Sequence, residues 1–199
     1  IITGGFNSTG GGGIHNMGTL TMSTGQINSN KSSNQGGGVY NTGSMTLSGG
    51  TISNNVANNT NGGGIYNSGT LTISGGEIKN NSATETSRNG GGIYNAGTLS
   101  ISGGEIKSNT ATGLGAGIYH DGATFSLQGA LDISGNASKN VYLTAAHPTI
   151  TINGDLGNST AIGITMETLG VFTSGLSTHG SIDKFSSEAG TSVALVANN

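Results

Sequence analysis

The chain has 199 residues, of which 39 are glycine and none is cysteine, and its formal net charge is −3 with only 8% charged residues. The lack of a basic patch excludes nucleic acid and anionic membranes as expected partners, and the lack of cysteine excludes disulfides, zinc fingers and thiol chemistry. No apolar run approaches the roughly 18 residues of a membrane-spanning helix.

The first residues, Ile1-Ile2-Thr3-Gly4-Gly5, contain no initiator methionine and no signal peptide, and they match the end of a repeat. We therefore expect the chain to be a fragment of a larger protein. The repeat is clearest in residues 62–81, which return almost letter for letter in residues 90–109. Looser copies begin at Gly11, Gly36 and Gly115, so successive copies start 25 to 28 residues apart. Self-similarity at such a period predicts a solenoid.

Each copy contains short runs in which apolar and polar residues alternate, as in Thr70-Leu71-Thr72-Ile73. This period of two indicates a β-strand, and the glycines between runs indicate tight turns. Ile65 and Ile78 each belong to a further strand whose apolar side chain should point inward. The sequence therefore predicts an all-β, single-stranded parallel β-helix across residues 1–139, with about 25 residues and three short strands per rung.

The C-terminal part, residues 140–199, departs from the repeat, and we expect it to form less regular closing coils of the same domain. Strand patterns recur in residues 141–143, 150–152, 162–164 and 193–195, and Pro148 is expected in a turn. Copy length varies mainly after the last asparagine of each repeat, so one corner of the coil should carry variable loops. The longest of these loops is expected in residues 82–89.

The repeats carry two paired boxes. The first is Gly-Gly-Gly-Ile or a variant of it, and the second is Ile-x-x-Asn, in residues 27–30, 52–55, 78–81, 106–109 and 133–136. This pairing resembles the GGAI and FxxN repeats of chlamydial polymorphic outer-membrane protein passengers. It is even more similar to Gly-rich repeats of large surface proteins of gut Firmicutes, whose closing segment resembles residues 163–175. The resemblance implies a right-handed β-helix, secreted and displayed at a bacterial surface, with adhesion as its role. It provides no catalytic residues.

In a stacked coil, equivalent residues align in columns about 4.8 Å apart, so candidate sites are sought by column. The first column is aromatic and directly follows the inward residue of the first box, so it should point outward. It contains His15, Tyr40, Tyr66, Tyr94 and Tyr119. The four tyrosines are the candidate ligand-binding residues, since exposed aromatic faces suit a sugar ring or a protein partner. Stacked tyrosines would also simply stabilise a sheet face.

A second column contains Gln26, Thr51, Glu77, Glu105 and Asp132. The three carboxylates, one rung apart, could hold Ca²⁺ or act as a glycosidase pair, whose spacing in retaining enzymes is about 5–5.5 Å. Lys79 and Lys107 follow on the same face and would neutralise the row. We therefore expect a solvated row of charges, with no metal site and no cofactor.

Two further kinds of column are polar. Outward Thr-x-Thr or Thr-x-Ser pairs recur in every rung and could match an ordered lattice such as ice, although any solvated strand uses such residues. Two asparagine columns should be structural, because stacked amides bond to one another. The columns are Asn16, Asn41, Asn67 and Asn95, ending in His120, and Asn30, Asn55, Asn81, Asn109 and Asn136. His120 is expected to be a turn substitute, and His147 and His179 have no partner at a recognisable motif spacing.

These patterns favour a non-enzymatic adhesin or stalk module of a bacterial surface protein. Its partner would be a glycan or protein of a host or bacterial surface, contacted through the tyrosines and the variable loops. The first alternative is a β-helix polysaccharide lyase or hydrolase that uses Glu77, Glu105 and Asp132. The second alternative is an ice-binding protein that uses the Thr-x-Thr face.

Overall fold

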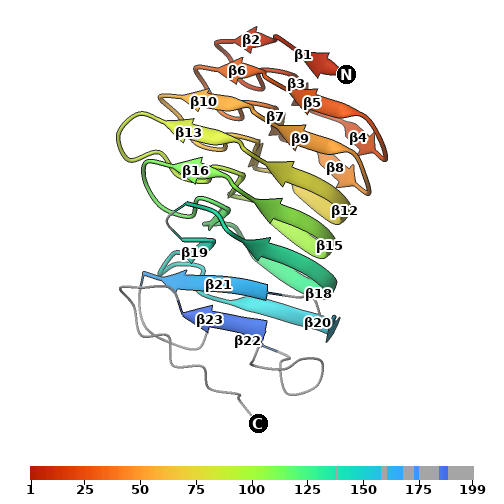
Figure 1. The fold of residues 1–199 in the computed structure, drawn as a ribbon, viewed down its shortest axis with the longest axis vertical. Coiled ribbons are helices and arrows are strands. Elements are labelled where there is room, and N and C mark those ends of the chain that lie inside the picture. Colours follow the sequence, from red (N-terminus) through yellow and green to blue (C-terminus); the bar gives the residue numbers. More distant parts are fainter. Residues whose placement is uncertain (138, 158–160, 168–172, 175–183, 188–199) are drawn as a thin grey trace.

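A computed structural model describes residues 1–137, 139–157, 161–167, 173–174 and 184–187 of the chain. The described part is all β and forms a parallel β-solenoid of about six turns, with equivalent residues spaced by about 26 positions, which confirms the predicted fold class (Figure 1). Ile65 pairs with Val39 on one side and with Ile93 on the other, so neighbouring coils superimpose in the expected register. None of the described segments forms a helix of the length and apolarity that a bilayer span needs.

Each complete coil passes through four strand positions. The first follows the glycine box, and its strands are called the box strands: β3 (Ile14–Asn16), β7 (Val39–Asn41), β11 (Ile65–Asn67), β14 (Ile93–Asn95), β17 (Ile118–His120) and β19 (Val141–Leu143). The second position holds β4 (Thr19–Met22), β8 (Ser44–Leu47), β20 (Ile150–Leu156) and β22 (Thr173–Ser174). The third holds β1 (Ile2–Thr3), β5 (Gln26–Asn28) and β9 (Thr51–Ser53).

Three longer strands turn the corner between the second and third positions without a break: β12 (Thr70–Lys79), β15 (Thr98–Lys107) and β18 (Thr124–Ser134). Near the C-terminus, β21 (Ala161–Met166) pairs first with β18 and then with β19, and β23 (Phe185–Ser187) pairs with β21. All of these strands belong to one 18-stranded sheet that wraps around the coil.

The fourth position forms a separate five-stranded sheet, which appears in Figure 1 as the column of strands on the left. Its strands are β2 (Phe6–Asn7), β6 (Lys31–Ser32), β10 (Val56–Asn58), β13 (Ser82–Thr84) and β16 (Thr110–Ala111). The sequence predicted three strands per rung and assigned residues 82–89 to a loop. The fourth strand was missed because its inward residue is small, as in Ala57 and Ala83, and therefore gives no apolar alternation.

The glycine box shapes the corner between the fourth strand of one coil and the box strand of the next. Gly62 has a φ of 75°, a conformation that residues with a side chain rarely adopt. A Cβ atom on Gly63 would lie 2.4 Å from the carbonyl oxygen of Gly91 and 2.5 Å from the carbonyl carbon of Ser82. The box is therefore glycine because the backbones of neighbouring coils pack against each other there.

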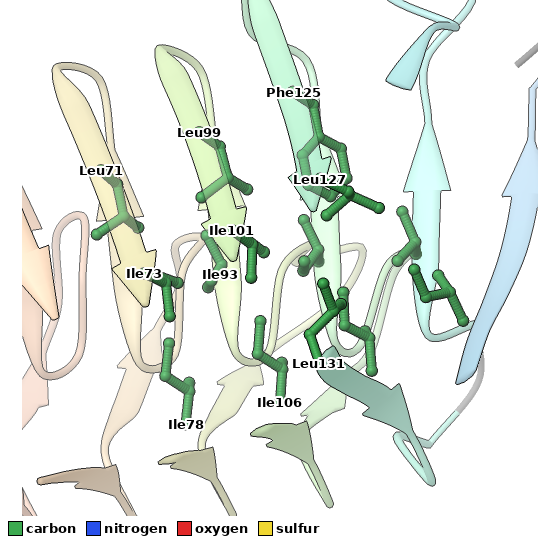
Figure 2. Close-up of a cluster of buried hydrophobic side chains, with 14 of the residues drawn as sticks. Leu71, Ile73, Ile78, Ile93, Leu99, Ile101, Ile106, Phe125, Leu127 and Leu131 are labelled. Atoms are coloured by element: carbon green, nitrogen blue, oxygen red, sulfur yellow. The ribbon is translucent and has the colours of Figure 1, made fainter. Parts of the chain in front are cut away.

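The core is a continuous column of aliphatic side chains in which each residue rests on its counterpart one coil away. Figure 2 shows Leu71, Leu99 and Phe125 in one such row, with further isoleucines and leucines completing the interior. Leu71, Leu99 and Phe125 are at most 1% exposed. Because a single coil contributes only a few apolar residues, it depends on stacking to bury them.

The closing coils continue the stack beyond residue 139. Strands predicted at residues 141–143, 150–152 and 162–164 correspond to β19, β20 and β21, whereas residues 193–195 lie outside the described part. Pro148 lies in the connection between β19 and β20, directly after the turn that the hydrogen bond from the His147 backbone N–H to the Thr144 carbonyl closes. Tyr142 lies only 23 positions after its partner Tyr119, and none of the described residues between β18 and β19 adds a strand to the second sheet.

Candidate functional site

Two buried asparagine ladders run parallel to the solenoid axis. In the first, the Nδ2 atoms of Asn16, Asn41 and Asn67 each donate to the Oδ1 atom of the next asparagine at 2.7 Å. In the second, the same bond joins Asn30, Asn55, Asn81, Asn109 and Asn136 at 3.0–3.1 Å. These side chains also bond to backbone groups, so both predicted ladders are confirmed as structural.

The aromatic column lies on the box strands, one residue before the first ladder. Its members pair coil to coil as predicted: His15 with Tyr40, Tyr40 with Tyr66, Tyr66 with Tyr94, and Tyr94 with Tyr119. The structure adds Tyr142, which pairs with Tyr119 and is only 7% exposed. The signal for Tyr142 is present in the sequence, since Val141-Tyr142-Leu143 follows the Ile-Tyr pattern of the box strands.

The rings mostly stack face to face. Centroid separations are 4.6 Å for His15 and Tyr40, 4.8 Å for Tyr66 and Tyr94, 5.0 Å for Tyr94 and Tyr119, and 5.4 Å for Tyr119 and Tyr142, with interplanar angles of 10–14°. Between Tyr40 and Tyr66 the rings are nearly perpendicular, at 83° and 5.5 Å. The expectation of open aromatic faces therefore needs correction, because most faces are covered by the neighbouring ring.

What the column offers to a ligand is a row of ring edges that carry hydroxyl groups. Tyr40, Tyr66, Tyr94 and Tyr119 are half-buried. Within the described residues, none of their hydroxyls bonds to another residue, and none is a buried atom left without a partner. Burial, together with neighbouring tyrosines and Asp121, raises the pKa of Tyr66, Tyr94 and Tyr119. The phenols therefore stay protonated and can donate hydrogen bonds at any ordinary pH.

The carboxylate column forms as predicted. Glu105 pairs with Glu77 on one side and with Asp132 on the other, and all three line an open groove of about 680 Å³ along the corner between the second and third strand positions. Lys79 forms an ion pair with Glu77. Lys107 lies 2.7 Å from Glu105 and 3.5 Å from Asp132, and its hydrogen bond to Glu105 raises its pKa.

These ion pairs neutralise two of the three carboxylate charges in the row, since Lys107 is shared by Glu105 and Asp132. Among the residues that the structure describes, no three histidine or acidic side chains converge to hold a metal ion. The Ca²⁺ candidates Glu77, Glu105 and Asp132 therefore line up along the groove without surrounding a common point.

The hydroxyl face is regular over two rows and then breaks. Thr70 stacks between Ser44 and Thr98, and Thr72 stacks between Thr46 and Ser100. The third row does not continue, because a β-bulge makes Ser74 pair with Gly103. In the last regular coil, Ser126 is only 6% exposed. The outward hydroxyls thus form two aligned rows of unequal exposure.

His120 takes the place of asparagine at the end of the first ladder and is buried. Its Nδ1 atom lies 3.0 Å from Asn95 Nδ2, and its ring contacts Phe125. The His147 ring lies 6.2 Å away, centroid to centroid, and His147 Nδ1 is 3.5 Å from Asp121 Oδ1.

The sequence missed this cluster, since it shows no partner for His147 at a recognisable motif spacing. His179 lies outside the described residues. The chain brings the two histidines together because β17 and β19 are neighbours and Thr144, just after β19, donates to Asp121. Burial, with a smaller contribution from His147, lowers the pKa of His120 to about 4, against the opposing effect of Asp121.

Comparisons with protein-family models, with curated proteins and with solved structures give no match for this chain. The structure supports the resemblance to bacterial surface repeats in architecture alone, since the chain forms a parallel β-solenoid with a repeat of about 26 residues.

Proposed function

We propose that this chain is a non-enzymatic module of a secreted bacterial cell-surface protein, which acts as a stalk and presents adhesive contacts. The supporting observation is the continuity of the stack. Asparagine ladders, core rows and aromatic rings each link coil to coil, so that bending the rod at any point would break several rows together. Such a rod suits the display of binding groups away from a cell.

The contact surface in this proposal is the tyrosine column and the loops that follow the second sheet. Aligned phenol hydroxyls about 5 Å apart, at the spacing of the coils, favour an extended polymer that lies along the column and accepts hydrogen bonds. A surface glycan meets this requirement, because its hydroxyl and ring oxygens recur along the chain. The covered ring faces favour this mode over stacking of sugar rings on the tyrosines.

The test is a glycan array probed with paired variants of Tyr66 and Tyr94. Replacing both with phenylalanine keeps the ring stack and removes two hydroxyls, and we expect it to weaken binding by about fivefold or more, at about 0.5–1.5 kcal/mol per hydrogen bond. Replacing both with serine removes the rings as well and should weaken binding at least as much. Unchanged binding by both pairs would show that the column is not the contact site.

The matched control replaces Thr72 and Ser100 with alanine, which removes two hydroxyls from the neighbouring face of the same coils. This pair should bind like the unmodified protein, and far-UV circular dichroism should be alike for all variants. Immunolabelling of intact source cells tests the proposed location separately, because a surface protein is labelled without permeabilisation. Absence of label on intact cells, with label after permeabilisation, would contradict a surface role.

The groove beside Glu77, Glu105 and Asp132 keeps the enzyme alternative open, since a polysaccharide could lie along it and place a glycosidic bond near two carboxylates. The ion pairs with Lys79 and Lys107 argue against this alternative. A lysine partner favours the ionised form of a carboxylate, whereas a general acid must carry a proton that it can donate to the substrate. Incubation with pectic, alginate and mucin glycans, with and without Ca²⁺, decides it. New reducing ends or unsaturated products would establish an enzyme.

The two aligned hydroxyl rows keep the ice-binding alternative open. The interrupted third row and the burial of Ser126 make the face less regular than a lattice would require. Thermal hysteresis near zero would exclude this function.

A further inference from the structure

A second row of residues runs beside the tyrosine column, two positions further along the chain in each coil. We call it the flanking row. From the second coil on, the backbone N–H of each member donates to the backbone carbonyl of the ladder residue one coil before, as from Ser68 to Asn41 and from Asp121 to Asn95. This repeated bond stacks the members in the order Met17, Thr42, Ser68, Ala96, Asp121, Thr144 and Glu167.

On its other side the tyrosine column borders bare backbone. The residue two positions before the tyrosine is glycine in each regular coil, as at Gly64 and Gly92. A Cβ atom on Gly64 would lie 2.7 Å from the carbonyl oxygen of Gly92, so the packing of neighbouring coils leaves no room for a side chain. The ring edges therefore stand beside a row without side chains, where an extended polymer can approach the hydroxyls.

Charge along the flanking row is confined to its later coils. The members in the first four coils, up to Ala96, are uncharged. Asp121 then lies two residues after Tyr119, and Glu167 lies two coils further on, beyond Thr144. A ligand that lies along the whole tyrosine column thus meets neutral groups first and carboxylates last.

The turn after β19 holds both carboxylates in place. Thr144 Oγ1 donates to Asp121 Oδ1 at 2.9 Å, and the backbone N–H of Ala145 donates to Glu167 Oε2 at 2.9 Å. Among the described residues, none donates to Asp121 Oδ2 or to Glu167 Oε1. The Asp121 side chain is 40% exposed, and Glu167 is exposed. Each carboxylate is therefore fixed through one oxygen and can accept hydrogen bonds from a ligand through the other.

The counter-charges near this end do not cancel the two carboxylates. Lys139 Nζ lies 5.3 Å from the centroid of the Tyr142 ring, and His147 Nδ1 lies 3.5 Å from Asp121 Oδ1. Two carboxylates against one lysine leave a single negative charge while His147 is neutral. This charge acts along the column, since Asp121 adds to the effect of burial in raising the pKa of Tyr119 and of two further tyrosines.

We propose that the ligand of the tyrosine column is a glycan with free amino groups. Its hydroxyls accept hydrogen bonds from Tyr94 and Tyr119, and its ammonium groups pair with Asp121 and Glu167. This inference rests on the glycan binding proposed above and names the chemical class of the glycan.

The same two carboxylates select against other glycans. A polymer of uronic acids would bring its own carboxylates beside Asp121 and Glu167, and like charges at such a contact oppose binding. An N-acetylated polymer keeps the hydroxyls that meet the tyrosines but carries no ammonium group. We therefore expect affinity to fall from the free-amine form to the acetylated form and again to the uronic acid form.

The test is a titration of the full chain with matched oligosaccharides at about pH 7, where an amino group is largely protonated. A glucosamine oligomer is compared with the same oligomer after N-acetylation and with an oligogalacturonate. We expect the free-amine form to bind about fivefold more tightly than the acetylated form, or better, at about 50 mM salt. The difference should shrink at about 1 M salt, because salt screens the ion pairs.

Paired variants assign the preference to the two carboxylates. Asp121→Asn and Glu167→Gln keep the oxygen acceptors for Thr144 and Ala145 and remove both charges. The protein with both changes should bind the free-amine and acetylated oligomers equally. Asp155→Asn is the matched control, because it removes an exposed carboxylate from β20, outside the column and the flanking row, and should leave the preference intact.

Equal affinity of the unmodified protein for the two oligomers, or no binding of the free-amine form, would overturn the proposal. So would a preference that persists in the double variant. If that variant does not fold, as judged by circular dichroism, the two oligomers still decide on the unmodified protein.

The acetylated oligomer separates this inference from the proposed function. If replacing Tyr66 and Tyr94 with phenylalanine weakens its binding but no amine preference exists, only the inference fails. If that replacement has no effect on either oligomer, the tyrosine contact fails, and the inference fails with it.

Discussion

His120 should make the stability of the solenoid depend on pH. Asn95 Nδ2 is a donor, so the Nδ1 atom of His120, 3.0 Å away, must act as the acceptor, which fixes the ring as the neutral form with its proton on Nε2. Protonation would place a second donor against the amide at the end of the first ladder. The ring is also buried against Phe125 and His147, which disfavours a charge there.

The size of the effect follows from the pKa. Burial lowers the pKa of His120 to about 4 in the folded chain, against about 6.5 when it is unfolded. Because the unfolded chain takes up the proton first as the pH falls, the stabilising contribution is complete above about pH 6.5 and is lost progressively toward about pH 4. A difference of this size corresponds to roughly 3 kcal/mol of unfolding free energy.

The assay is urea unfolding of the unmodified protein and of His120→Asn, each at about pH 7.5 and about pH 4.5. Asparagine extends the ladder with a side chain that does not titrate in this range. We expect the unmodified protein to lose about 2–3 kcal/mol more than the variant between the two pH values. The comparison isolates residue 120, since both proteins contain the same remaining ionisable groups.

A smaller side chain at position 120 leaves space beside Phe125, so His120→Asn should lower the absolute stability at neutral pH. This loss does not affect the test, which depends on the difference between two pH values. If both proteins lose the same free energy on acidification, within about 0.5 kcal/mol, the reasoning about the buried imidazole is refuted.

Two further predictions concern the asparagine and carboxylate columns. Asn81→Ala should cost roughly 3–5 kcal/mol in urea unfolding, because the buried backbone N–H and side-chain amide of Asn55 both lose the Oδ1 acceptor of Asn81, and the Ile52 carbonyl loses the Nδ2 donor. Thr72→Ala on the outer face is the matched control, and a similar loss in both variants would contradict a special role for the ladder. Lys107→Met should change the unfolding free energy by at most about 1 kcal/mol, and less at high salt, because its ion pairs are exposed to solvent. A larger loss, or one that salt does not reduce, would contradict the reading of a solvated row of charges.

Much of the candidate site could be predicted because it repeats. Once the period is recognised, the alignment of Tyr66 with Tyr40 and Tyr94, and of Glu77 with Glu105, follows from stacking alone. The orientation of the tyrosine rings could not be predicted in this way. It depends on side-chain rotamers that are settled by the adjacent ring, and the result is a row of edges where the sequence suggested faces.

The sequence by itself determined the solenoid, its register and its asparagine ladders, because each of these follows from a local pattern copied at a constant spacing. Only the tertiary structure decided the features for which the repeat carries no recognisable sequence pattern. The fourth strand and the contact of His120 with His147 both arise from groups that meet across coils without a repeated signal. A periodic sequence specifies the interior of a stack, whereas its ends and its irregular loops are specified by contacts that occur once.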